Sequence, residues 1–358
     1  MYVYNQPTLE RKNIIKLAAV IAFLMASAVF WGLSAGAAAE AEKGYGQVVQ
    51  IRSEGQLLNV ERLADLLENR DFEKEDIRFT AWSQENDVTI ENYSLGARTR
   101  LDCALYYFGD NSEMFDLVLD NGCALSEAAA FSVFGTASGI LGETVVIGGE
   151  NYVVEKLLYG STAPLIYKVG EDDSRAGFDA LDVVFGEGAE MSASELRMVY
   201  GVGGDITVYY GSVVKAFMAL GKLALLIAFA AFALIALGGL TKGMGKWLRR
   251  AVMAGGLALA CFCCLALVGS PFYIPGSFIP TRWSEFEFWS STFSNFGDSW
   301  NYYFSMKTYA PDILFRSYIV KTVVFAAISA SLAIISAVVL RGMASGHGRE
   351  RHVRKPVI

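Results

Sequence analysis

The sequence predicts a helical membrane protein with four spans and an α+β domain inserted between the first span and the other three. Four windows are apolar and free of charge: residues 17–39, 223–240, 251–280 and 322–340. The segment between the first two windows is strongly acidic. Within that segment, residues 117–160 alternate short apolar runs with glycine-containing turns, as a small mixed α/β domain does.

The four windows set the predicted boundaries. A spanning helix needs about 20 apolar residues, and prolines at 271, 275 and 280 end the third helix near Ser270. We therefore expect a cytoplasmic N-terminus (1–16), spans at 17–39, 213–240, 251–270 and 318–340, the α+β domain (40–212), a cytoplasmic loop (241–250), an aromatic outer loop (271–317) and a basic cytoplasmic tail (341–358). Residues 17–39 end in small residues like a signal peptide. Their uncharged stretch is longer than the apolar region of a usual signal peptide, so an uncleaved span is favoured.

Charge predicts the orientation. Residues 40–212 hold 31 Asp and Glu against 12 Lys and Arg, and the rest of the chain holds 6 against 18. Basic segments stay in the cytoplasm, so both termini are expected inside and residues 40–212 outside a multi-pass protein of the cell membrane. An acidic domain repels phosphate, which argues against a nucleic-acid partner.

Local signals predict the elements of the domain. Residues 60–69 form a helix with leucines on one face, and strands are expected at 77–83, 88–93, 99–108, 117–119, 144–147, 152–158, 164–169, 181–185 and 206–210. Ser126 caps a short helix over 127–134 that Gly135 ends. Gly148 and Gly149 turn a hairpin that requires positive φ. Ser192 and Glu195 form a capping box for a helix over 193–200.

The residues offer little chemistry for catalysis. Both histidines, His347 and His352, lie in the predicted cytoplasmic tail, so the outer domain has none for a catalytic triad or a zinc site. The chain has no P-loop motif. We expect no catalytic residue, no metal and no cofactor, and hence no enzyme. Cys103 and Cys123 are both predicted outside, where oxidation is permitted, and a disulfide between them is left open.

The order of elements also resembles a known family. A strand, the turn Gly122-x-x-Leu125-Ser126, a helix ending Phe134-Gly135 and the run Gly142 to Val154 resemble the extracytoplasmic core of MacB/FtsX-type ABC transporter permeases. The resemblance implies one span, an outer domain and three spans, with movement driven by a separate ABC ATPase. It also implies a homo- or hetero-dimer with another permease-like subunit. Thr241–Arg250 does not match the family's coupling segment, so the resemblance is to a diverged permease or an accessory subunit, and without a P-loop no ATPase domain is expected in this chain.

Two functions follow as hypotheses. The first is a non-catalytic permease-like subunit of an ABC export or mechanotransmission system, in contact with the lipid bilayer and a separate ATPase. The contact is expected in the cytoplasmic loop, through Lys242, Lys246, Trp247, Leu248, Arg249 and Arg250. The alternative is a membrane-anchored binding or sensing protein that is not coupled to an ATPase. The aromatic outer loop is expected to be partly helical and to brace the bundle at the outer surface, with a substrate or lipid entry surface as the alternative.

Overall fold

A computed structural model of the chain describes residues 11–68, 77–110, 117–171, 177–185, 193–240 and 286–353, with 245, 247, 250, 252, 254, 255 and 258. The chain divides into two compact units. A helical unit comprises Met1–Ala39, Lys215–Pro275 and Tyr318–Ile358. An α/β unit comprises Glu40–Val214 and Gly276–Ser317.

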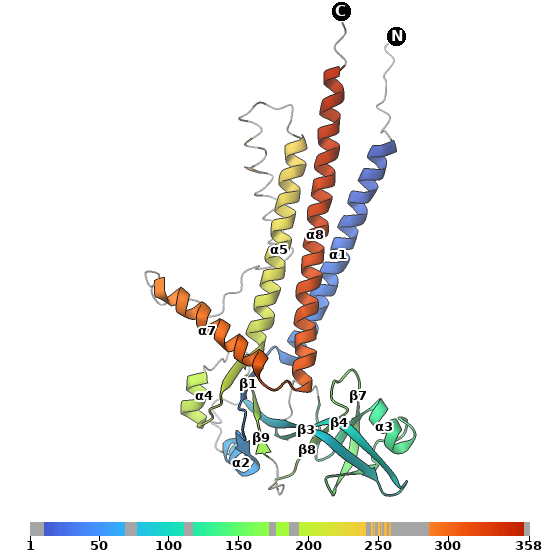
Figure 1. Ribbon diagram of the computed structural model, residues 1–358, viewed down its shortest axis with the longest axis vertical. Coiled ribbons are helices and arrows are strands. Elements are labelled where there is room, and N and C mark those ends of the chain that lie inside the picture. The colour runs from blue at the N-terminus through green and yellow to red at the C-terminus, as the bar shows by residue number, and fades with distance from the viewer. Residues whose placement is uncertain are drawn as a thin grey trace, which may run out of the picture. The chain divides into compact units, whose positions relative to one another are not determined.

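The helical unit contains most of three long helices, α1 (Arg11–Tyr45), α5 (Tyr210–Leu240) and α8 (Ala310–Val353) (Figure 1). Among the described residues, two helical stretches are long and apolar enough to cross a membrane, Ile14–Tyr45 and Ala310–Gly342. An apolar helix at each end of the chain, with a mixed α/β domain between them, confirms the coarse layout. Most of the predicted third span, 251–270, lies outside the described residues, and four spans stay a prediction.

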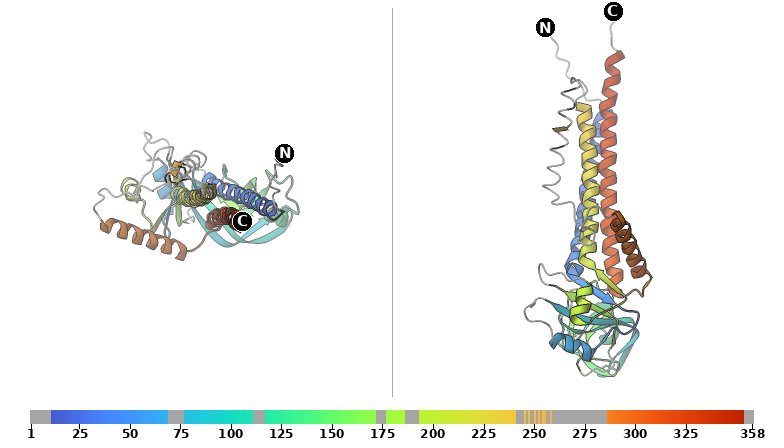
Figure 2. Two further views of the ribbon diagram at one scale, coloured as in Figure 1. Left: turned by 90° about the horizontal axis from the view of Figure 1, so that it is seen from above. Right: turned by 90° about the vertical axis from the view of Figure 1, so that its left-hand side faces the viewer.

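Helices α1 and α8 pack along a seam of small and hydroxylated residues. Ser27 and Ser329 each donate a side-chain hydrogen bond of 2.8 Å to the other's backbone carbonyl oxygen. Seven residues further along α1, the hydroxyl of Ser34 donates to the carbonyl oxygen of Thr322 at 2.8 Å. Residue numbers rise along α1 while they fall along α8, so the helices are antiparallel. Two turns separate successive contacts, as in left-handed helix pairs. Figure 2 shows α5 beside α8, and an added Cβ at Gly221 would lie 3.3 Å from that of Ala326.

One curved sheet organises the α/β unit. Its nine strands follow the order β11-β1-β10-β3-β4-β8-β5-β7-β6, and a further pairing of β3 with β6 closes β3, β4, β8, β5, β7 and β6 into a ring. The strands are β1 (Val48–Arg52), β3 (Arg78–Asn92), β4 (Ala97–Gly109), β5 (Cys123–Ser126), β6 (Thr144–Ile147), β7 (Glu150–Leu158), β8 (Leu165–Lys168), β10 (Ala180–Val184) and β11 (Ile206–Tyr209). A second, two-stranded sheet joins β2 (Leu58–Asn59) to β9 (Gly177–Phe178).

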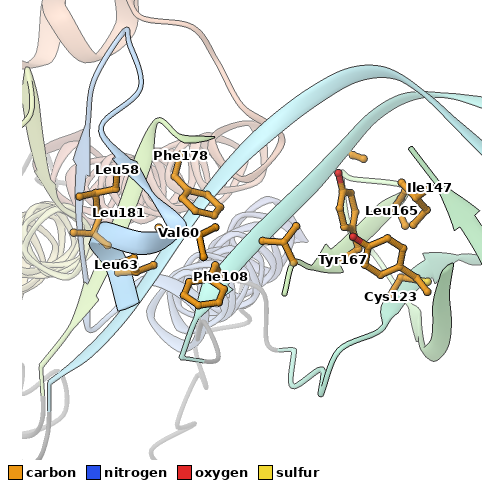
Figure 3. Close-up of a cluster of buried hydrophobic side chains, with 14 of the residues drawn as sticks. Leu58, Val60, Leu63, Phe108, Cys123, Ile147, Leu165, Tyr167, Phe178 and Leu181 are labelled. Atoms are coloured by element: carbon orange, nitrogen blue, oxygen red, sulfur yellow. The ribbon is translucent and has the colours of Figure 1, made fainter. Parts of the chain in front are cut away.

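Four helices complete the unit: α2 (Val60–Glu68), α3 (Glu127–Phe134), α4 (Ala193–Tyr200) and α7 (Phe286–Ser305). The core side chains form one cluster that follows the curved strands, and Figure 3 shows part of it. Val60, Leu63, Phe108, Cys123 and Tyr167 are among its members. Burial of these apolar side chains stabilises the domain, at about 25 cal/mol per Å² removed from water.

Several local predictions are confirmed. Ser126 caps α3 by accepting a hydrogen bond from the N–H of Ala129 at 3.2 Å, and Gly135 ends that helix with φ 72°. Gly148 and Gly149 have φ 59° and 93°, and the paired Ile147 and Glu150 leave these two residues as the hairpin turn. Positive φ at both positions is typical of a type I′ turn.

Two strand predictions are wrong. Residues 77–83 and 88–93 are not separate strands but parts of one long strand, β3, which passes through Asp87 at φ 60°. Residues 117–119 form no strand, although Leu117 and Leu119 are buried. The strand in this region is β5, which begins after the turn at residues 120–122. Pairing with β7 and β8 is made by 123–126. The carboxylate of Glu155 satisfies the backbone N–H groups of Asp120 and Asn121.

Candidate functional site: a buried ion pair where three helices end

The candidate site is built around a buried arginine on β1. This strand lies between β10 and β11, and all five of its residues are buried, including Gln50 and Arg52. The side chain of Arg52 is 1% exposed. A buried guanidinium requires an opposite charge and hydrogen-bond acceptors around it, because removing it from water is costly.

Asp312, in the first turn of α8, supplies that charge. Its side chain is 0% exposed, and it forms two hydrogen bonds with the guanidinium. Nη2 of Arg52 lies 2.5 Å from Oδ1, and Nη1 lies 2.9 Å from Oδ2. This bidentate arrangement is the strongest geometry that an arginine and a carboxylate can adopt.

The same carboxylate starts helix α8. Oδ2 of Asp312 accepts the backbone N–H of Tyr309 at 2.9 Å, so the acid reaches back to the residue that precedes the helix. An acidic side chain in the first turn also interacts favourably with the helix dipole. The next donor, the N–H of Ala310, binds Oε1 of Gln84 at 2.8 Å. The beginning of α8 is therefore fixed by side chains from β1 and β3.

A hydroxyl group and an amide extend the ion pair into a network. The hydroxyl of Tyr210, the first residue of α5, accepts from Nη2 of Arg52 at 3.1 Å and donates to Oε1 of Gln50 at 3.0 Å. The Nε of Arg52 also donates to Gln50. The Gln50 amide in turn donates to Oδ1 of the buried Asp182 on β10 at 2.6 Å. The network thus joins two neighbouring strands to the starts of α5 and α8.

Helix α1 reaches the same place through its last residue. The hydroxyl of Tyr45 donates to the carbonyl oxygen of Pro311 at 2.8 Å. The rings of Tyr45, Tyr210 and Phe315 form a trio, one from each long helix, with centroid separations of 4.6–5.3 Å. Gly211 lets the backbones approach closely, because an added Cβ would lie 2.0 Å from the carbonyl oxygen of Gly46.

The end of α7 completes the surroundings of Arg52. The hydroxyl of Tyr303 donates to Oδ1 of Asp312 at 3.0 Å. The Arg52 guanidinium lies 5.1–5.9 Å from the ring centroids of Trp82, Tyr303 and Tyr309, within reach of cation–π attraction. We call the set Gln50, Arg52, Tyr210, Tyr303 and Asp312 the junction.

The electrostatics of the junction keep the arginine charged. Burial alone would lower the pKa of Arg52, but the influence of Tyr210 and Asp312 and the hydrogen bonds to Asp312 outweigh it and raise that pKa. Burial, assisted by the nearby Asp312, raises the pKa of Tyr303 to about 12. Tyr303 is therefore neutral at physiological pH and donates its proton to the carboxylate.

The charged groups of the junction bind one another inside the protein. Each buried polar atom of the ion pair is engaged, and neither partner faces solvent. Within the described residues no group of three His, Cys, Asp or Glu is placed to hold a metal ion. An open surface hollow of 490 Å³ lies over β3 and β4, where Arg98 and Arg100 pair with Glu91 and Asp87.

The predicted partner-contact residues are only partly described. Trp247 is 84% exposed and Arg250 is exposed, while Lys242, Lys246, Leu248 and Arg249 lie outside the described residues. An exposed tryptophan in this segment is compatible with a partner contact, which stays a prediction. The backbone of His347 and His352 belongs to α8, and their side chains lie outside the description.

The structure does not bring Cys103 and Cys123 together. Both are free thiols, on β4 and β5, and β8 runs between these strands. Cys123 pairs with Tyr167 on β8, and Tyr167 pairs in turn with Tyr106 on β4. Tyr106 lies three residues beyond Cys103 along β4. Strands are about 4.8 Å apart, so the two Cα atoms are separated by more than the roughly 7 Å that a disulfide spans. Burial and the nearby Glu155 raise the pKa of Cys123 to about 12.

The sequence-based interpretation missed every junction residue. Arg52 and Asp312 are 260 positions apart, and no local pattern connects them. Two weak signals were present. The apolar run of β1 contains Gln50 and Arg52, and Asp312 lies just before an apolar window, where an acid begins a helix.

No protein-family model matches the chain, and no curated protein sequence matches it. Among solved structures, the chain is similar to the extracellular domain of a noncanonic ABC-type transporter, YknZ, from Gram-positive bacteria. The two share 14% sequence identity with a TM-score of 0.30, over 43% of this chain and 95% of that one. A TM-score this low does not establish a common fold.

Proposed function

We propose that the chain is a non-catalytic, permease-like membrane subunit of an ABC export or mechanotransmission system, and that the junction passes helix movement to the α/β domain. The observation that carries the proposal is the convergence of three helix ends on one buried network. Tyr45 of α1, Tyr210 of α5 and Asp312 of α8 all contribute to it or pack against it. A helix that shifts along its axis displaces these groups, and with them β1 and β10.

The arrangement of the helices supports this proposal. Because α1 and α8 are antiparallel, the N-terminal end of α1 and the C-terminal end of α8 lie on the same side of the helical unit. The basic segments of the sequence occur at those two ends and in residues 241–250, and the positive-inside rule predicts that all three lie in the cytoplasm. The α/β domain is then extracytoplasmic, and energy must come from a partner that binds the cytoplasmic side.

The partner in this proposal is a separate ATPase, because the sequence contains no P-loop. The exposed Trp247, with its neighbour Leu248, is the proposed anchor in the cytoplasmic loop. A buried aromatic anchor is worth about 2 kcal/mol or more at a true hot spot. The resemblance of residues 115–160 to the permease family suggests a second permease-like subunit as well.

The test is recovery of an ATPase with the intact chain in mild detergent. We expect the wild type to recover one, and the Trp247→Ala, Leu248→Ala double variant to recover at least tenfold less. Replacing Phe131, exposed on α3, with alanine is the matched control and should leave the yield unchanged. If the double variant recovers as much ATPase as wild type, the proposed contact through the cytoplasmic loop is ruled out. If the wild type recovers no ATPase, the sensing function takes the place of the transport function.

The topology is tested separately by labelling single cysteines on intact cells, with the native cysteines removed. We expect ready labelling at Ser174, in the α/β domain, and protection at Ser345, near the C-terminus. Protection at Ser174 or labelling at Ser345 would contradict the orientation.

A further inference from the structure

A second arginine, Arg316, is held where α7 ends and α8 begins. Its Nη2 donates to the backbone carbonyl oxygen of Tyr303 and its Nη1 to the hydroxyl of Thr308, both at the long distance of 3.4 Å. Its Nε is buried and has no hydrogen-bond partner among the described residues. A guanidinium has five donors, so most of its capacity here is unused or weakly used.

Among the described residues, no carboxylate neutralises the charge of Arg316 either. Across the described stretches of the chain, no carboxylate oxygen lies within 4.0 Å of its nitrogen atoms. The closest acid along α8 is Asp312, four residues earlier, and that carboxylate is occupied by Arg52, Tyr303 and the N–H of Tyr309. This corner therefore holds a cation with free donors that no described carboxylate neutralises.

Aromatic rings surround the cation. The guanidinium carbon lies 5.0 Å from the ring centroid of Tyr303 and 4.8 Å from that of Phe304. Trp300 stacks on Phe304 at 5.4 Å, and Phe304 is 55% exposed. Arginine beside tryptophan and tyrosine is the composition of the membrane–water boundary, where aromatic rings and headgroups meet.

The position in the chain points to the same boundary. The apolar stretch Ala310–Gly342 begins only five residues after α7 ends at Ser305. Helix α7 has two acidic and no basic residues, and aromatic residues recur along it at intervals of three or four: 286, 289, 293, 296, 300 and 303. Exposed polar residues, among them Glu287, Ser291, Ser294 and Asp298, occupy other positions. This pattern is typical of a helix that lies in a lipid interface.

We infer that Trp300, Tyr303, Phe304, Thr308 and Arg316, which we call the elbow, bind the phosphate of a phospholipid headgroup. The free guanidinium donors and the Thr308 hydroxyl bind the phosphate oxygens, and the exposed rings of α7 lie against the lipid. Arginine suits this role because its planar fork matches phosphate geometry. Tyr303 also donates to Asp312 and so belongs to the junction. A lipid bound at the elbow therefore holds Tyr303 in place. The assignment stands whether or not an ATPase is found.

Native mass spectrometry of the full-length protein, titrated with phosphatidylglycerol, tests the site. We expect wild type to retain one lipid that Arg316→Gln binds at least tenfold more weakly, since a charge-assisted hydrogen bond is lost. Arg316→Lys, which keeps the charge without the fork, should fall between them. Arg98→Gln removes an exposed arginine that pairs with Glu91 and should bind like wild type. Equal retention by wild type and Arg316→Gln would overturn the assignment.

Three further measurements separate the sources of phosphate and guard against misfolding. Diacylglycerol, which has no phosphate, should not be retained, and equal retention of it would overturn the phosphate assignment. Inorganic phosphate at 10 times the lipid concentration should not displace the lipid; full displacement would assign the site to a free anion. A photoreactive phosphatidylglycerol should cross-link wild-type protein within residues 300–317, and cross-links found only elsewhere would contradict the site even if Arg316→Gln does not fold.

Discussion

Helices α1 and α8 are joined in two chemically different ways. Along the seam, neutral hydroxyl groups donate to backbone carbonyl oxygens, and small residues fill the contact. At the junction, the start of α8 is held by a buried ion pair within a network of tyrosines, and Tyr45 of α1 binds its backbone. Hydrogen bonds between helices in a membrane contribute about 0.6 kcal/mol each. Breaking a buried ion pair by removing one partner costs about 3–5 kcal/mol.

The difference indicates where the molecule tolerates movement. Seam contacts are weak, repeated and similar to one another, so one can be lost or shifted with little penalty. At the junction, loss of either charged partner is costly, because it leaves the other one buried without its counter-ion. Under the proposed function, the helices adjust along their length while their ends stay attached at the junction.

The largest effect is expected from Arg52→Met. It leaves Asp312 buried without its counter-ion, and we expect about 3–5 kcal/mol loss in the free energy of unfolding, measured by thermal denaturation of the full chain in detergent. Combining Arg52→Met with Asp312→Leu removes both charges and should recover most of that loss. Gly148→Val with Gly149→Val serves as the comparison variant. Valine fits poorly at positive φ, so this double variant should destabilise the same domain at a place away from the helix ends. If Arg52→Met alone were as stable as wild type, the ion pair would not be important for stability.

Gly211→Ala should have the next largest effect. The added Cβ would lie 2.0 Å from the carbonyl oxygen of Gly46, which is backbone and cannot rotate away. We expect a loss of about 1–3 kcal/mol, typical of overpacking. At Gly36 in α1 an added Cβ meets no described atom within 4 Å, so Gly36→Ala is the control and should cost nothing. Equal melting temperatures for the two variants would show that the glycine contact is dispensable.

A smaller, pH-dependent effect is expected from Tyr303→Phe. The hydroxyl binds a charged carboxylate, and its loss should cost about 1.5 kcal/mol at pH 8. The folded pKa of about 12 exceeds the ordinary value near 10, so this contribution is fully present below pH 10 and is lost as pH rises toward 12. The stability difference between wild type and variant, measured from pH 8 to 12, should therefore shrink. A constant difference would mean that the hydroxyl does not titrate as described.

The smallest effect belongs to the seam. Ser27→Ala should lower stability by about 0.6 kcal/mol, and Ser27→Ala with Ser329→Ala by no more than about twice that. Thermal denaturation in the same detergent compares them directly with the junction variants. A loss of 3 kcal/mol or more from Ser27→Ala would erase the contrast between the two regions.

The sequence predicted the elements whose signals are local. Helix α3 followed from Ser126 and Gly135, and the β6–β7 hairpin from two glycines, because capping and positive φ depend on neighbouring residues. Strand β1 was missed because buried Gln50 and Arg52 break the expected pattern of an apolar strand. Residues 117–119 have the composition of a strand but make no strand pairing. Apolar side chains can be buried without hydrogen bonds between their backbone and a neighbouring strand.

The junction could not be predicted for a related reason. Its residues come from positions 50, 52, 210, 303 and 312, and each taken alone has an ordinary interpretation. An aspartate at a helix start is usually a cap, and it is one here. Only the folded chain shows that the same carboxylate also neutralises an arginine 260 residues away.

The central claim is that the junction holds three helix ends as one cooperative structure. Hydrogen–deuterium exchange of the full chain measures this directly, with wild type and Arg52→Met compared peptide by peptide. We predict that the variant loses protection together in residues 41–46, 210–214 and 310–315, while residues 144–158 of the hairpin keep theirs. Loss confined to β1, or unchanged protection in any one of the three helix ends, would contradict the claim.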